Sequence, residues 1–154
     1  MPSRLATAIK QTKPFVSTEE EVFLAVQRTA SELNQGIGEL LKPEGITGPQ
    51  YNVLRILRGS GDEGLACREI GERLVTRDPD VTRLLDRMES QGLIARARES
   101  ADRRVVTTRI TAKGRELLAR LDKPIAELHL RQLGHLGQTK LRKLLELLEE
   151  ARAF

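Results

Sequence analysis

The chain lacks several features that mark particular protein classes. Its 154 residues include one cysteine, no tryptophan and only 3% aromatic residues. A single cysteine excludes an intramolecular disulfide and fits a reducing compartment, so we expect a cytoplasmic protein. No apolar run approaches the length of a membrane span, and the first residues lack the apolar core of a signal peptide. We therefore expect no association with a membrane.

The motifs of common enzymes are absent as well. The sequence contains no glycine-rich phosphate loop and no nucleophile elbow. The two histidines, His129 and His135, are six residues apart across an expected helix break, so one helical face cannot hold both. The sequence therefore predicts no enzymatic activity, no cofactor and no metal site.

Charged residues and leucines dominate the composition instead. Charged residues make up 31% of the chain, and this balance favours helices packed by aliphatic side chains over a sheet protein. The length suits one domain with a proper core. The net charge of +4 is compatible with a polyanionic partner, but many proteins are this basic, so charge alone decides little.

The most informative stretch is 78–111, which predicts one helix followed by one basic hairpin. Asp78 is a suitable N-cap, Pro79 a suitable first helical residue, and Gly92 a suitable end. Between them an apolar stripe recurs at helical spacing, formed by Val81, Leu84, Leu85 and Met88. The β-branched run 105–110 predicts a strand paired back on 93–98, and Thr111 can cap a further helix.

A helix with exposed arginines beside a basic hairpin matches the two grooves of DNA. The major groove admits one α-helix and offers guanine acceptors to arginine, and a narrow minor groove attracts an inserted arginine. We expect Arg83 to meet a base edge or a nearby phosphate, Thr82 and Arg87 to meet the backbone, and Arg77 and Arg68 to be weaker phosphate contacts. The alternative is a solvated helix with an ordinary charged turn, and the order of the elements favours DNA.

The segment GLIARARESADRRVVTTRITAKGRELL resembles the wing and following helix of the MarR (multiple antibiotic resistance regulator) family of winged helix-turn-helix transcription factors. The resemblance lies in Asp102-Arg103-Arg104, the β-branched strand, Ile110-Thr111 and Lys113-Gly114-Arg115, and it extends from about residue 20 to residue 152. It implies that Arg103 or Arg104 enters the minor groove or contacts a phosphate, while Asp102 holds the hairpin tip. Asp78 and Asp80 depart from the family, which tends to have Ser or Thr in this turn, so the operator sequence stays open.

The expected fold is mainly α with a small β-wing. Ser17 caps a helix that runs to about Leu41, and Thr47 with Gln50 forms a capping box that opens a second helix. A short strand at Leu65 is expected to add to the hairpin. A short helix over 67–74, joined by a turn to the helix that follows, makes a helix-turn-helix arrangement. We expect a single MarR-like domain over 1–154, with the winged helix-turn-helix region at 46–111 and dimerisation helices at 15–41 and 112–154.

The last helix carries an apolar stripe that needs a partner surface. A homodimer is the economical answer, and folding back onto the first helix is the alternative. The residues expected at the dimer interface are Phe15, Val16, Leu141, Leu144, Leu145 and Leu148. The resemblance favours the dimer and implies a repressor on a palindromic operator, released by a small, often aromatic inducer near Tyr51 and Arg55.

Two other functions remain open from the residues. One is a winged-helix scaffold for protein–protein assembly. The other is an oxidant-sensing regulator, because some relatives sense oxidants by cysteine, and Arg68 with a helix N-terminus could lower the pKa of the Cys67 thiol. The reactive cysteine of such relatives usually lies near the N-terminus, so an inert, partly buried Cys67 is favoured.

Overall fold

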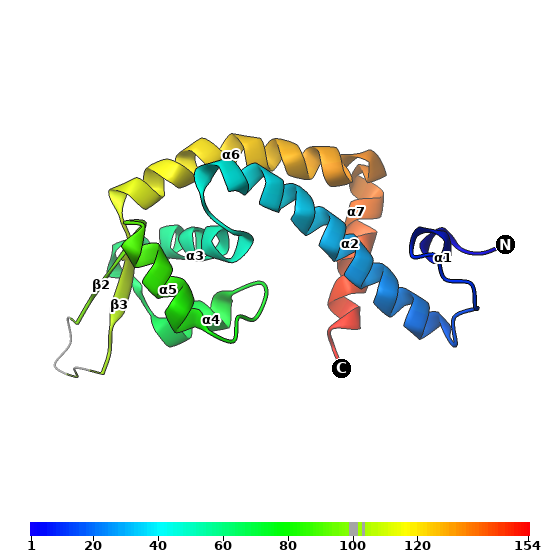
Figure 1. Cartoon of the computed structure of the whole chain (residues 1–154), viewed down its shortest axis with the longest axis horizontal. Helices are drawn as coiled ribbons and strands as arrows, with labels where there is room; N and C mark the ends of the chain where they lie inside the picture. The colour runs from blue at the N-terminus through cyan, green and yellow to red at the C-terminus, as the bar shows by residue number, and fades with distance from the viewer. Residues whose placement is uncertain (99–101, 103) are drawn as a thin grey trace. The chain divides into compact units, whose positions relative to one another are not determined.

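A computed structural model describes residues 1–98, 102 and 104–154 of the chain. The chain forms two compact units, Met1–Gly36 and Ile37–Phe154. The first unit holds α1 (Arg4–Ala8) and most of α2 (Thr18–Leu41). In chain order, the second unit then contains η1 (Lys42–Glu44), α3 (Gly48–Gly59), η2 (Gly61–Glu63), β1 (Leu65–Ala66), α4 (Cys67–Arg73), α5 (Val81–Ser90), β2 (Ile94–Ala97), β3 (Thr107–Ile110), α6 (Ala112–Leu133), η3 (Gly134–Leu136) and α7 (Gly137–Ala151) (Figure 1). The predicted fold class, mainly α with a small β-wing, is confirmed.

Side-chain caps set the first residues of the long helices. The Ser17 hydroxyl accepts the Glu20 N–H at 3.1 Å, and α2 begins at the next residue, Thr18. Thr47 and Gln50 form the predicted capping box of α3, in which each side chain accepts the other residue's backbone N–H. Thr111 caps α6 by accepting the Gly114 N–H at 3.1 Å. These caps satisfy donors that a helix start leaves unpaired, which is why short polar signals located the starts well.

The three strands form one small antiparallel sheet in the order β1-β3-β2. Ile94 pairs with Ile110 and Ala97 with Thr107, so β2 and β3 make a hairpin in register. Leu65 pairs with Thr108, which confirms the prediction that Leu65 adds a short strand to the hairpin. Figure 1 shows β2 and β3 beside α5, with α6 beginning at the end of β3.

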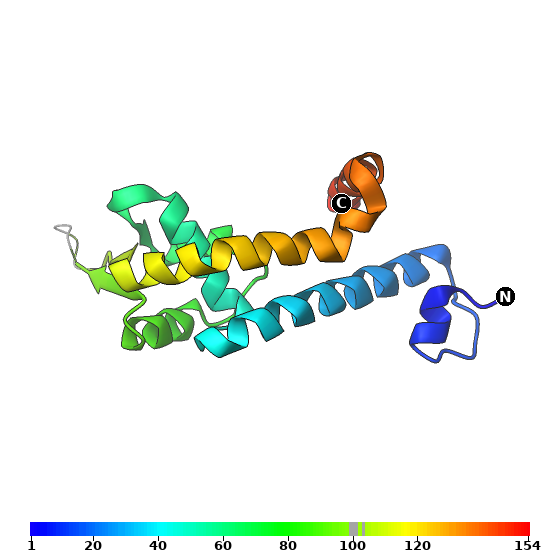
Figure 2. The same ribbon diagram turned by 90° about the horizontal axis from the view of Figure 1, so that it is seen from above.

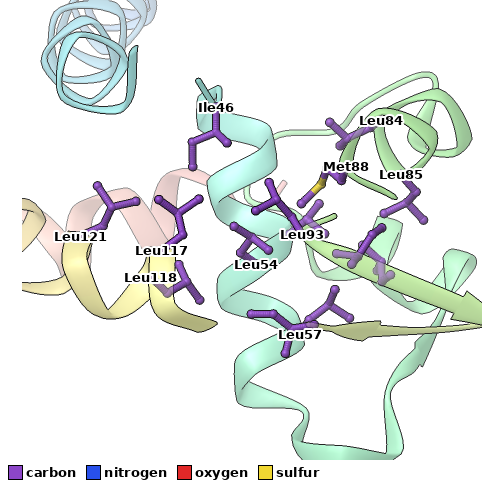
Figure 3. Packing of buried hydrophobic residues seen from close by; sticks show 14 of the residues in the cluster. Ile46, Leu54, Leu57, Leu84, Leu85, Met88, Leu93, Leu117, Leu118 and Leu121 are labelled. Carbon is purple, nitrogen blue, oxygen red and sulfur yellow. The ribbon is translucent and has the colours of Figure 1, made fainter. Parts of the chain in front are cut away.

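The core of the second unit lies around α3. Leu54 and Leu57 on α3 are fully buried, with Leu117, Leu118 and Leu121 of α6 on one side and α5 with the sheet on the other (Figure 3). Figure 2 shows α6 as one continuous helix, and it runs through Pro124 without ending there. Within the described residues, none of the helices combines the length and the apolar character that crossing a membrane requires.

Two helical glycines offer a direct test of this packing. A Cβ at Gly114 would lie 2.5 Å from the Leu93 carbonyl oxygen and 2.8 Å from a side-chain carbon of Ile110, so Gly114→Ala should lower the free energy of unfolding by about 1–3 kcal/mol. A Cβ at Gly38 meets nothing within 4 Å, so Gly38→Ala should raise it by about 0.5–1 kcal/mol. Urea unfolding at one protein concentration measures both. Effects of the same sign would contradict the close approach of α6 to Leu93.

Candidate nucleic-acid interface

Helices α4 and α5 are joined by the turn 74–80 and are held against α3. Ile70 of α4 and Leu85 of α5 are fully buried, and the Asn52 side chain on α3 accepts the Val75 N–H at 2.8 Å. Both helices are thereby anchored by their apolar sides, and the turn is anchored by a specific hydrogen bond. The outer side of α5 is left facing solvent, as a helix-turn-helix requires of its second helix.

The start of α5 differs from the sequence-based expectation. The helix begins at Val81, and Asp80 is its N-cap, with its carboxylate accepting the Arg83 N–H at 3.0 Å. Asp78 instead accepts the Asp80 N–H at 2.8 Å, which closes a local turn before the helix. The prediction of Asp78 as cap and Pro79 as first helical residue is therefore wrong. Because the turn uses Asp78, the helix begins two residues later than expected.

The exposed side of α5 carries the predicted polar residues. Thr82, Arg83 and Arg87 are all exposed, while Leu85 and Met88 are fully buried. The Arg83 side chain is 72% exposed, and its Nε lies 3.6 Å from the Asp80 carboxylate. Such an exposed pair contributes little to stability, so it leaves Arg83 available to a stronger anionic partner.

A group of ion pairs joins α5 to the hairpin, and sequence reasoning missed it. One terminal nitrogen of Arg96, on β2, donates to the Asp86 carboxylate at 2.6 Å and to the Glu89 carboxylate at 3.0 Å. The Arg96 backbone N–H also donates to Glu89, at 3.1 Å. The hydrogen bond from Arg96 lowers the pKa of Glu89, and its carboxylate partners raise the pKa of Arg96. We call Arg96, Asp86 and Glu89 the Arg96 clasp.

Near the hairpin tip, the described residue Asp102 binds the described residues that follow it. Its carboxylate accepts the backbone N–H of Arg104 at 3.0 Å and the Arg104 Nε at 3.3 Å. Its carbonyl oxygen accepts the Val105 N–H at 3.1 Å. The Arg104 side chain is 92% exposed, whereas Arg103 lies outside the described residues. The described tip therefore presents an exposed guanidinium next to a hydrogen-bonded turn.

The other predicted residues of this surface lie on α4 and in the turn. Arg68 is exposed and pairs with Glu72 at 3.0 Å, and Arg77 is exposed in the turn before α5. Cys67, the first residue of α4, is half-buried beside a cavity of about 420 Å³ that Arg96 and Arg104 also line. Among residues 1–98, 102 and 104–154, His, Cys, Asp and Glu side chains form no group able to hold a metal ion.

Tyr51 and Arg55, the residues named for a ligand, lie one turn apart on α3. The Arg55 guanidinium carbon is 6.0 Å from the centroid of the Tyr51 ring. Partial burial raises the pKa of the Tyr51 hydroxyl. Beside them Arg58 donates two hydrogen bonds of 2.9 Å to Asp122 on α6, which lowers the pKa of Asp122. This bidentate pair, also missed from the sequence, ties α3 to α6.

Exposed apolar side chains occur on the helices at both ends of the chain. On α2, Val22, Phe23 and Val26 are exposed, and Val16 before it is exposed while Phe15 is half-buried. On α7 none of the 15 residues is buried. Its leucines divide into exposed positions, Leu144, Leu145 and Leu147, and half-buried positions, Leu141 and Leu148. A leucine-rich helix with no buried residue leaves a large apolar area in water.

Comparison with known proteins gives consistent matches. A model of the MarR family matches residues 44–105. A MarR transcription factor from Planctomyces limnophilus is 38% identical, with 88% of this chain and 98% of that chain covered and a TM-score of 0.68. The HTH-type transcriptional regulator TtmR of Methylorubrum extorquens is 37% identical over an aligned region that covers 69% of this chain and 53% of TtmR. A MarR mutant from E. coli complexed with operator DNA has the same fold, with 20% identity, 98% and 99% coverage and a TM-score of 0.77.

Substitution of the two aspartates before α5 tests which one caps the helix. Asp80→Ala removes the acceptor of the Arg83 N–H and should lower the free energy of unfolding by about 1 kcal/mol. Asp80→Asn keeps a side-chain oxygen as acceptor and should lower it by only about 0.3 kcal/mol. Chemical denaturation followed by circular dichroism provides the measurement. Asp78→Ala is the matched control, and a larger loss from it than from Asp80→Ala would return the cap to Asp78.

Proposed function

This chain belongs to the MarR family, and we propose that it is a transcriptional regulator that binds double-stranded DNA as a homodimer on a palindromic operator. The observation that carries the proposal is the pairing of two basic projections on one body. Helix α5 exposes Arg83 and Arg87, and the neighbouring hairpin exposes Arg104. These shapes suit the major and the minor groove, respectively. The likeness to E. coli MarR, whose structure is complexed with operator DNA, supports the same use of the fold.

The proposed contacts follow from the exposed side chains. Helix α5 lies in the major groove, where Arg83 exchanges its weak pair with Asp80 for a base edge or a phosphate. Thr82 and Arg87 contact the DNA backbone beside it. Arg68 on α4 and Arg77 in the turn contact further DNA phosphates. At the wing, Arg103 or Arg104 enters the minor groove while Asp102 holds the turn.

The homodimer is supported by the apolar surface left on the terminal helices. We propose that residues 15–41 and 112–154 form the dimer interface, with Phe15, Val16, Leu141, Leu144, Leu145 and Leu148 among its contacts, and that 46–111 contacts DNA. A two-fold dimer presents two copies of α5, which then meet two half-sites about one helical turn, roughly 34 Å, apart. The operator is therefore palindromic.

We propose further that the chain acts in the cytoplasm as a repressor that a small aromatic molecule releases from DNA. The support is the placement of Tyr51 and Arg55 together on α3, the helix whose Arg58 pairs with Asp122 of α6. An aromatic ring and a guanidinium together suit a planar, acidic ligand. Nothing in the described part of the chain favours a protein scaffold, an oxidant switch at Cys67 or catalysis.

Selection of duplexes from a random pool, followed by a salt titration, tests DNA binding. We expect a palindrome to be enriched and the affinity for it to fall steeply with salt, because each neutralised phosphate releases counterion. Changing Arg103 and Arg104 together to Ala should reduce the slope of log K against log salt by about 1–2. Fluorescence anisotropy of a labelled duplex measures this slope.

The matched control removes two positive charges elsewhere. Arg4, on α1, and Lys13 are both exposed, and they lie outside the regions proposed for DNA and dimer contacts. Their joint change to Ala alters the net charge equally and should leave the salt slope nearly unchanged. Failure of the native chain to enrich any duplex in dilute buffer would refute DNA binding, and equal slopes for both variants would refute the role of the wing.

The dimer interface is tested by adding charge to α7. Leu144→Glu with Leu145→Glu places two carboxylates on its apolar side, and their burial against a second chain would be costly. We expect the native chain to sediment at twice the mass of one chain and the variant to sediment as a monomer. Val75→Glu, at an exposed valine in the turn before α5, is the control and should remain dimeric. A native monomer, or a variant that stays dimeric, would contradict the proposed interface.

A further inference from the structure

The Arg96 clasp is a network of three charged side chains, in which the Asp86 and Glu89 side chains are 58% and 42% exposed. Its guanidinium serves two carboxylates at once, and the Arg96 side chain is only 22% exposed. The backbone N–H of the same residue also donates to Glu89, so both the side chain and the main chain of β2 are bound to α5. Hydrogen bonds between charged groups are about twice as strong as neutral ones and have narrower geometry.

The position of the clasp follows from the two periodicities that meet there. Asp86 and Glu89 are three residues apart on α5, so their side chains emerge on the same side of the helix. Arg96 is two residues after the buried Ile94 on β2, so it lies on the strand face that turns toward the helices. A residue on the strand face that packs against helices is usually apolar. Its replacement by arginine is accounted for by the two carboxylates it meets.

The base of the hairpin is already fixed by other contacts. The Thr111 hydroxyl donates to the Gly92 carbonyl oxygen at 2.6 Å, and the Thr111 N–H donates to the Leu93 carbonyl oxygen at 3.1 Å. These bonds anchor the ends of β2 and β3 nearest the core. Beyond the base, β1 pairs with β3 at Thr107 and Thr108, whereas β2 is the outer strand of the sheet and has no strand on its other edge within the described residues. The Arg96 clasp binds β2 beyond that base, directly to the exposed helix.

We propose that Arg96 is a positioning residue that couples the wing to α5, so that the wing tip and the helix meet their two grooves as one rigid body. The inference rests on the proposed DNA binding and adds to it a dependence between the two contacts. With the clasp intact, docking of α5 in the major groove already places the wing arginines at the minor groove, so their contacts form without a further loss of conformational entropy. With the clasp broken, the wing must be ordered during binding, and its contribution falls.

A double-mutant cycle measures this dependence. The probe is the duplex selected by the native chain, and the wing variant is Arg103→Ala with Arg104→Ala. In the native background we expect the wing variant to weaken binding about tenfold or more. In an Arg96→Gln background we expect it to weaken binding less than about threefold, because contacts that depend on one another do not add.

A second way of breaking the clasp separates geometry from charge. Asp86→Asn with Glu89→Gln also removes the ion pairs, but it makes the surface more positive, whereas Arg96→Gln makes it more negative. If the clasp positions the wing, both backgrounds reduce the effect of the wing variant. If charge alone matters, the two backgrounds change the total affinity in opposite directions and leave the effect of the wing variant at its native value.

Every outcome of the cycle bears on the proposal. An unchanged effect of the wing variant in both backgrounds overturns the coupling, and so does a wing variant that binds as well as the native chain. Circular dichroism and thermal unfolding establish that each background is folded, and the two chemically different backgrounds keep the test decisive if one is not. Failure of the native chain to bind any selected duplex counts against the proposed function itself, which distinguishes that failure from the failure of the coupling.

Discussion

The packing of α5, α6 and the sheet around α3 is the constraint on which the exposed surface of the second unit depends. Leu85 and Met88 are fully buried, and the helical period then places Thr82, Arg83 and Arg87 in solvent. The orientation of the arginines therefore comes from leucine and methionine burial and not from the arginines themselves. A shift of α5 by one residue would bury charged side chains, which is far more costly than any gain from surface ion pairs.

Polar contacts at the end of α5 lock the same arrangement. Gly92 has a φ of +74°, and the Gly92 and Leu93 N–H groups donate back to Glu89 and Met88, which ends the helix. The Gln91 side chain accepts from Gln50 at 3.1 Å and donates to the Gly45 carbonyl oxygen at 3.1 Å, and Lys113 donates to the Gln91 carbonyl oxygen. The C-terminal end of α5 is thus bound to α3, to the segment before it and to α6. Its N-terminal end is held by the Asp80 cap.

Local signals were readable from the sequence, and long-range pairings were not. The caps at Thr47 and Thr111, the apolar stripe of α5 and the glycine after it each involve residues within a few positions of one another, so pattern alone located them. The turn Asp78-Pro79-Asp80 offered two carboxylates at suitable spacing, and only the local fold shows that the second one is the cap. Arg96 and Arg58 find partners 7 to 10 and 64 residues away, respectively, which no periodicity specifies. The sequence offered one indication of the Arg96 ion pairs, which is an arginine at a strand position that faces the helices.

The charge balance of α5 limits how its surface can bind a polyanion. The helix carries two positive side chains, Arg83 and Arg87, and two negative ones, Asp86 and Glu89, and Asp80 caps it with a further carboxylate. Its net attraction for a phosphate backbone is therefore small, and non-specific binding, which depends on neutralised phosphates, gains little from it. The Arg96 clasp turns both negative side chains toward the hairpin and leaves the arginines exposed. Binding through this surface must then depend on where the guanidinium groups are held more than on how many there are. A sequence-specific contact needs this dependence on position. On a misplaced duplex the arginines lose their partners, while the carboxylates still repel the phosphates.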